Sequence, residues 1–148
     1  MRRGLEMQYK DCGTDVLNLV EKVKLECYPV LAHTSMRCVF SLKPMSRGSK
    51  DVLAVVRKVT SLERQLGIGY DFILLINEQR WILLNSYQQE ALIDHELAHI
   101  RCKVREDGSV EYRLVGHDVE EFTDVVKRRG LWDVDLKELV EKVLESKK

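Results

Sequence analysis

The chain has 148 residues, of which 45% are hydrophobic, and its 24 basic residues balance its 24 acidic residues. This length predicts about one domain with a sizeable core, and the balanced charge gives no reason to expect a nucleic-acid or anionic-lipid partner. No apolar segment in the sequence is long enough for a membrane span or for the core of a signal peptide, so we expect a cytoplasmic, intracellular protein. The four cysteines are scattered, without a Cys-x-x-Cys pair, and are expected to be reduced.

The first part of the chain predicts a helix followed by strands. Residues 1–12 are expected to form a flexible tail. Apolar residues then recur at helical spacing from Thr14, a candidate N-cap, to the residue before Pro29. Alternating apolar and polar residues over 36–43 predict a strand with one buried face. Residues 51–66 fit a helix by their spacing but are rich in β-branched residues, so helix and strand both stay open.

In the middle of the chain, residues 70–77 ("YDFILLIN") predict a well-buried strand, and residues 77–84 a turn with a short helix. Ser86 and Gln89 have the spacing of a capping box, which predicts a helix from there to about Arg101.

A β-hairpin is expected next, around Gly108. A three-residue loop (107–109) would pair Cys102 with Leu114 and give one apolar and one charged face, so we prefer it to a two-residue loop. Mixed helices and short strands on one core predict an α+β domain over residues 13–148. Two further helices are expected, at 118–129 and 135–146.

The run "LIDHELAHI" places a glutamate between two histidines on the predicted helix. His95 and His99 are four residues apart, so their ring nitrogens can reach one ion. Glu96 lies between the histidines and the apolar side of the helix, where a lone carboxylate would be costly. A bound zinc ion explains the arrangement, with Glu96 as the general base toward the water that zinc activates. The alternative is an ordinary buried helix with hydrogen-bonded histidines.

The sequence offers two candidates for a third zinc ligand. His117 is the main candidate for a third zinc ligand, because the hairpin returns the chain toward the end of the HELAH helix. Glu121 is the competing candidate, although its spacing from Asp118 also fits a capping box. His33 precedes the first strand and is expected to be a loop histidine.

Charged residues mark the remaining side of the HELAH helix. Glu90, Asp94 and Arg101 share it, so we expect this side to face solvent.

These residues resemble a known family. "ALIDHELAHI" and "GHDVEEF", with "DFILLIN" and Trp81 upstream, are similar to the putative phage metallopeptidases, zinc-peptidase-like proteins of phages and prophages. The resemblance runs from about residue 36 to residue 133, and the layout is more distantly similar to SprT-like domains. SprT-like proteins often carry a cysteine-based zinc ribbon that this sequence lacks, so no nucleic-acid partner is expected.

The resemblance implies a zincin-like fold, in which a small β-sheet packs against an N-terminal helix, the HExxH helix and C-terminal helices. It implies sheet rather than helix for "VLAVVRKVT". It also implies one zinc ion per chain, held by His95, His99 and His117, with Glu96 as the catalytic residue.

The leading hypothesis is a zinc metallopeptidase that acts on a peptide or protein substrate. Tyr112 is a candidate for stabilising the oxyanion, but we prefer to interpret it as a core residue of the hairpin. The alternative is a catalytically silent zinc-binding module that engages a protein partner, and a protease assay with a Glu96 control distinguishes the two. A third hypothesis is a hydrolase of the peptide deformylase type with Cys38 as ligand, which loss of zinc from a Cys38→Ser variant would support.

Overall fold

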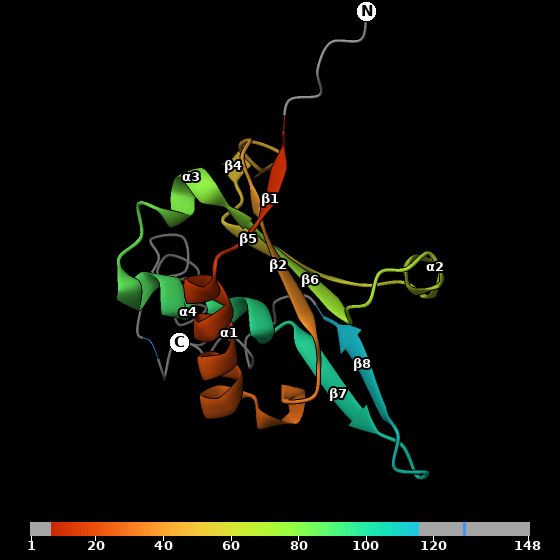
Figure 1. The fold of residues 1–148 in the computed structure, drawn as a ribbon. Coiled ribbons are helices and arrows are strands. Elements are labelled where there is room, and N and C mark those ends of the chain that lie inside the picture. Colours follow the sequence, from red (N-terminus) through yellow and green to blue (C-terminus); the bar gives the residue numbers. More distant parts are fainter. Residues whose placement is uncertain (1–6, 116–128, 130–148) are drawn as a thin grey trace, which may run out of the picture. The chain divides into compact units, whose positions relative to one another are not determined.

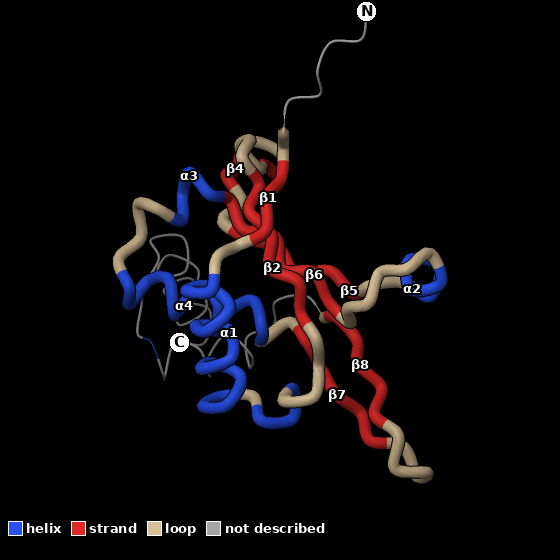
Figure 2. Tube along the Cα trace, in the orientation of Figure 1, coloured by secondary structure: helices blue, strands red, loops and turns tan. Residues whose placement is uncertain are grey.

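The computed structural model describes residues 7–115 and Arg129, and its fold is of the α+β class (Figures 1 and 2). The chain divides into two compact units, Met1–Leu84 and Asn85–Lys148, and each is described by itself. The prediction of a single domain over residues 13–148 stays a prediction. The elements in chain order are β1 (Tyr9–Asp11), α1 (Thr14–Cys27), η1 (Pro29–Leu31), β2 (Met36–Ser41), β3 (Ser46–Arg47), β4 (Lys50–Asp51), β5 (Ala54–Lys58), α2 (Ser61–Gln65), β6 (Phe72–Asn77), α3 (Glu78–Trp81), α4 (Ser86–Leu97), β7 (Ile100–Val104) and β8 (Val110–Leu114).

A four-stranded sheet with the order β1-β2-β6-β5 organises the first unit. β2 and β6 run parallel, whereas β1 and β5 are antiparallel to their neighbours and form the two edges. β6 confirms the strand predicted for "YDFILLIN", and Phe72, Leu74 and Ile76 on one face are 0% exposed. The strand predicted over residues 36–43 is confirmed as β2, which ends at Ser41, and Met36 and Cys38 are buried on the predicted face. The predicted alternation does not continue to the end of the strand, because Ser41 on the other face is buried as well.

The ambiguous residues 51–66 contain both kinds of structure. β5 pairs with β6 over Ala54–Lys58, as the resemblance implied, and α2 follows after a short gap. A capping box marks the change, since the Thr60 side chain accepts a hydrogen bond from the backbone of Glu63 and the Glu63 side chain accepts one from the backbone of Thr60.

Part of the predicted N-terminal tail is a strand. Residues 9–11 pair with β2, and the backbone N–H of Cys12 extends the contact by donating to the carbonyl of Cys38 at 2.9 Å. The tail prediction is therefore wrong for residues 9–11. The sequence did not reveal this strand because all three of its residues are exposed, so it lacks apolar alternation.

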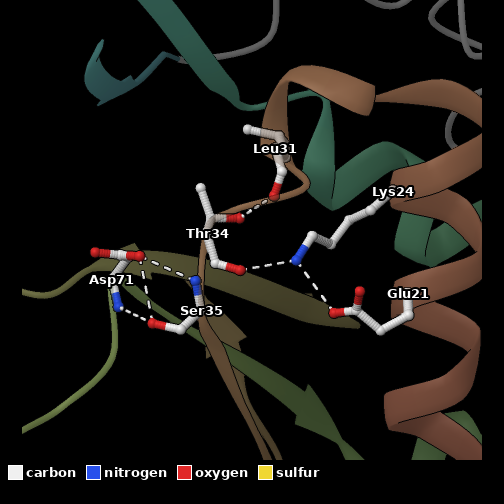
Figure 3. Close-up of polar contacts among 6 residues, drawn as sticks. All are labelled: Glu21, Lys24, Leu31, Thr34, Ser35 and Asp71. Atoms are coloured by element: carbon white, nitrogen blue, oxygen red, sulfur yellow. Dashed lines mark hydrogen bonds and ion pairs between the residues drawn. The ribbon is translucent and has the colours of Figure 1, made fainter. Parts of the chain in front are cut away.

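The predicted first helix is confirmed as α1, but Gly13 rather than Thr14 is its N-cap. Its inner side includes a lysine, Lys24, which is 1% exposed. Figure 3 shows the partners of its ammonium, which donates to the Thr34 carbonyl at 2.8 Å and pairs with Glu21 at 3.1 Å. A buried charge needs such partners, so Lys24 ties α1 to the segment that leads into β2.

A second polar cluster joins the starts of the two parallel strands. The Asp71 carboxylate accepts hydrogen bonds from the backbone N–H of Ser35 at 2.9 Å and from its hydroxyl at 3.3 Å (Figure 3). Arg64 pairs with the same carboxylate at 2.5 Å. These contacts hold the segment before β6 beside the segment before β2.

The second unit begins with α4, the helix predicted to carry the histidines. Its N-cap is Asn85, whose side chain accepts from the backbone of Gln88 at 2.8 Å, while the Gln88 side chain accepts from the backbone of Asn85 at 3.0 Å. The predicted capping box of Ser86 and Gln89 is therefore wrong by one residue. Asparagine and serine cap helices about equally well, so residue type alone does not separate the two positions.

α4 also ends earlier than predicted. Its last residue is Leu97, and after a turn β7 begins at Ile100. The prediction of a helix that continues to Arg101 is wrong, because residues from Ile100 onward pair with β8 instead of continuing the helical hydrogen bonds.

β7 and β8 form the predicted hairpin, but in a register two residues away from the predicted one. Cys102 lies opposite Tyr112 rather than Leu114. The loop comprises residues 106–108, and its last residue, Gly108, has φ 86°. In three-residue hairpin loops the left-handed residue comes last, and glycine adopts that conformation most easily. The predicted loop placed Gly108 in the middle, which explains the error.

The helices predicted at 118–129 and 135–146 lie outside the described residues, apart from Arg129, whose backbone is helical. Within the described part of the chain, no helix has the length and apolar character needed to cross a membrane.

Candidate metal centre

Three side chains at the end of α4 converge. His95, Glu96 and His99 each offer a possible ligand atom, and these atoms lie within 4.8 Å of one another. The two imidazole rings are nearly perpendicular, with centroids 5.3 Å apart. His95 lies in the last turn of α4. His99 lies in the turn that follows the helix, and its backbone N–H donates to the Glu96 carbonyl at 3.2 Å. The structure thus brings together the three residues that the sequence singled out.

The chemistry of these donors fits a divalent metal ion. Imidazole nitrogens and carboxylate oxygens are ligands of zinc, at distances of roughly 2.0–2.2 Å, so the residue types in this cluster suit such an ion. The two histidines are half-buried, while Glu96 is 5% exposed. The imidazoles therefore keep some access to solvent, whereas the carboxylate is largely shielded from it.

The end of β8 fixes the orientation of one imidazole. His99 Nδ1 lies 2.7 Å from the carbonyl oxygen of Val115, and the backbone N–H of Val115 donates to the His99 carbonyl at 2.8 Å. A carbonyl only accepts hydrogen bonds, so this contact assigns the proton to Nδ1 and the lone pair to Nε2. Metal-binding histidines commonly have such a partner on the second nitrogen, because it fixes the tautomer and the ring orientation.

The apolar side of α4 is where the sequence predicted it. Leu92, Ile93 and Leu97 are at most 2% exposed. The expectation that Glu96 loses most of its water is confirmed by its 5% exposure. Burial of a carboxylate costs free energy unless charged or polar groups compensate. The buried position of Glu96, directly after His95, therefore indicates that such groups lie close to it.

The side of α4 that the sequence assigned to solvent is instead covered. The Asp94 side chain is 0% exposed and lies 3.2 Å from Nε of Arg129, and Nη1 of the same arginine lies 3.2 Å from Glu90. The prediction of a solvated face is therefore wrong at Glu90 and Asp94. A charged residue is a poor marker of solvent when a distant arginine can neutralise it.

Two candidates from the first unit have ordinary structural explanations. His33 is an exposed residue of the loop before β2, as predicted. Cys38 is buried, and burial raises the pKa of its thiol to about 11. A metal-binding cysteine must be deprotonated, so the raised pKa does not favour Cys38 as a ligand.

The remaining candidates from the sequence are His117, Glu121 and Tyr112. His117 and Glu121 lie outside the described residues, so the choice of third ligand stays a prediction. Tyr112 is half-buried on β8, opposite Cys102, which agrees with the preferred place in the hairpin.

Sequence reasoning missed two contributors, the Val115 carbonyl and Arg129. The carbonyl has no side-chain signature, and only the correct hairpin register would have placed it opposite His99. The spacing between Asp94 and Arg129 in the sequence does not predict their contact. The one available signal was the pair Glu90 and Asp94, two carboxylates one helical turn apart that require a cation if they are buried.

Comparison with known proteins gives one match. The model of the family described as "Putative phage metallopeptidase" matches residues 10–145, which is most of the chain. No curated protein and no solved structure matches the chain.

Proposed function

Because the chain belongs to the family of putative phage metallopeptidases, we propose that it is a zinc-dependent metallopeptidase encoded by a phage or prophage. The family supports a metal ion and a peptide or protein substrate. The choice of zinc and the roles of the individual residues are our proposals.

The observation that carries the proposal is the His95, Glu96 and His99 cluster, together with the contact between His99 Nδ1 and the Val115 carbonyl. A ligand must present a lone pair toward the ion, and the Val115 contact leaves that lone pair on Nε2 of His99.

In this proposal His95 and His99 hold the ion, and His117 completes the ligand set, with Glu121 as the alternative. When bound, zinc lowers the pKa of a water molecule and polarises the scissile carbonyl. Glu96 accepts the proton of the attacking water and returns it to the leaving amine. Its shielded position beside the histidines supports this role, because a base kept away from bulk water interacts more strongly with a nearby proton donor.

The test compares the zinc-loaded full chain with its Glu96→Gln variant. Both would be incubated with an unfolded protein substrate, and new peptide termini would be identified by mass spectrometry. We expect cleavage by the parent alone. Equal cleavage by the two proteins would remove Glu96 from the mechanism.

A second candidate is a zinc-binding module without catalytic activity that engages a protein partner. The hairpin favours it, because Val104, Val110 and Leu114 on one face are 69%, 43% and 36% exposed. Exposed apolar side chains on one surface are typical of an interaction site. A chain that holds zinc but cleaves nothing, with or without Glu96, would support this candidate over the peptidase.

A further inference from the structure

A shielded arginine, Arg129, pairs with two carboxylates of the helix that carries His95. Arg129 Nε lies 3.2 Å from the Asp94 carboxylate, and its Nη1 lies 3.2 Å from Glu90. The side chains of Arg129, Asp94 and Glu90 are 12%, 0% and 16% exposed. One guanidinium therefore spans two carboxylates that are one turn apart on α4.

We infer that Arg129 is a positioning residue for the metal centre, and that its contacts with Asp94 and Glu90 order the helix that carries His95. This inference rests on the proposed function. Asp94 directly precedes His95, so whatever holds the Asp94 side chain also limits the movement of the first ligand. Glu90 adds a second point of attachment one turn earlier, which opposes rotation of the helix about its axis.

Electrostatics explains why an arginine is needed at this position. Two carboxylates four residues apart on a helix repel each other, and the repulsion grows when water is excluded. A guanidinium donates several hydrogen bonds in a fixed planar arrangement, so it can serve both carboxylates at once. A lysine ammonium is a point charge on a flexible stem and would replace only part of this geometry.

Loss of Arg129 should therefore disturb the ligands and not merely the stability. Without the guanidinium the two carboxylates would repel each other more strongly, and this repulsion would shift the helical turn that carries His95 and Glu96. Loss of a residue that orients metal ligands typically weakens metal binding by about 10- to 100-fold.

The test uses the full chain with Arg129→Met, which keeps the length of the side chain, and Arg129→Lys, which keeps the charge. The matched control is Arg105→Met, because Arg105 pairs with Glu111 at the same 3.2 Å but with the two side chains 56% and 48% exposed. Zinc affinity would be measured by competition with a chromophoric chelator. The visible spectrum of the Co²⁺-loaded protein would report the geometry around the metal.

We expect Arg129→Met to weaken zinc binding at least tenfold and to change the Co²⁺ spectrum, Arg129→Lys to recover part of both, and Arg105→Met to alter neither. A folded Arg129→Met protein with the zinc affinity and Co²⁺ spectrum of the parent would overturn the inference. If Arg129→Met does not fold, Arg129→Lys decides: a parental affinity and spectrum would equally overturn it.

A metal-free measurement separates this inference from the proposed function. If the parent binds no zinc, the proposed function fails, and the amide hydrogen exchange of α4 still reports on Arg129. Faster exchange in α4 of Arg129→Met, and not of Arg105→Met, would support the ordering role. Unchanged exchange would contradict it.

Discussion

We expect the loss of Arg129 to destabilise the protein much more than the loss of Arg105, although the ion pairs of the two arginines are equally long. Arg129 lies 3.2 Å from both Asp94 and Glu90, and Arg105 lies 3.2 Å from Glu111. At this distance each pair attracts by about 5 kcal/mol at an effective dielectric constant of about 20. Removing one partner of a buried pair leaves an uncompensated charge and costs roughly 3–5 kcal/mol, whereas an exposed pair contributes roughly 0–1 kcal/mol.

Thermal or urea unfolding of metal-free protein would measure the difference. Arg129→Met should lower the melting temperature by roughly 6–20 °C, from about 2–4 °C per kcal/mol for a chain of this size, and Arg105→Met by at most about 4 °C. Adding Glu90→Gln and Asp94→Asn to Arg129→Met should recover part of the loss, because the two carboxylate charges are then removed together with the guanidinium. Equal losses for the two single variants would show that burial does not decide the strength of these pairs.

Three further predictions follow from the proposed site. Glu96→Gln should keep one zinc ion per chain but lower peptide turnover by roughly 10²- to 10⁴-fold, the usual contribution of a general base, which paired metal analysis and cleavage assays would check. His117→Ala should bind zinc far more weakly than Glu121→Gln in a chelator competition, and the reverse ranking would make Glu121 the third ligand. Saturating zinc at about 1,000 times its dissociation constant should raise the unfolding free energy by about 4 kcal/mol. The chelated protein should still melt cooperatively, because the core of the first unit does not depend on the metal, and loss of that transition would contradict this expectation.

The parts of the fold that the sequence predicted are those in which burial follows a simple period. β6 alternates between buried and half-buried positions from Phe72 to Ile76, β2 alternates over Met36–Cys38, and α1 buries Val16, Val20 and Val23 on one side. In each case the hydrophobic effect selects one face, so the pattern of apolar residues specifies the element. The grouping of His95, Glu96 and His99 was predictable from their spacing, although only His95 and Glu96 lie in α4 and His99 lies in the turn that follows it.

The errors occur where local chemistry or a distant partner decides. Asn85 and Ser86 are both good caps, so the start of α4 depends on which side chain meets the backbone of Gln88. The hairpin register depends on the conformation of one glycine, Gly108, and it determines which carbonyl reaches His99. The environment of Asp94 depends on an arginine 35 residues away, and no local pattern contains that information.

The central claim is that this chain is a zinc protein whose ion is held by the HELAH histidines. The most direct measurement is the zinc content, by mass spectrometry of the metal, of the full chain after zinc loading and removal of unbound ion. The account predicts about one zinc ion per parent chain and close to none in the His95→Ala and His99→Ala variants. A parent chain that retains no zinc, or histidine variants that retain as much as the parent, would contradict it.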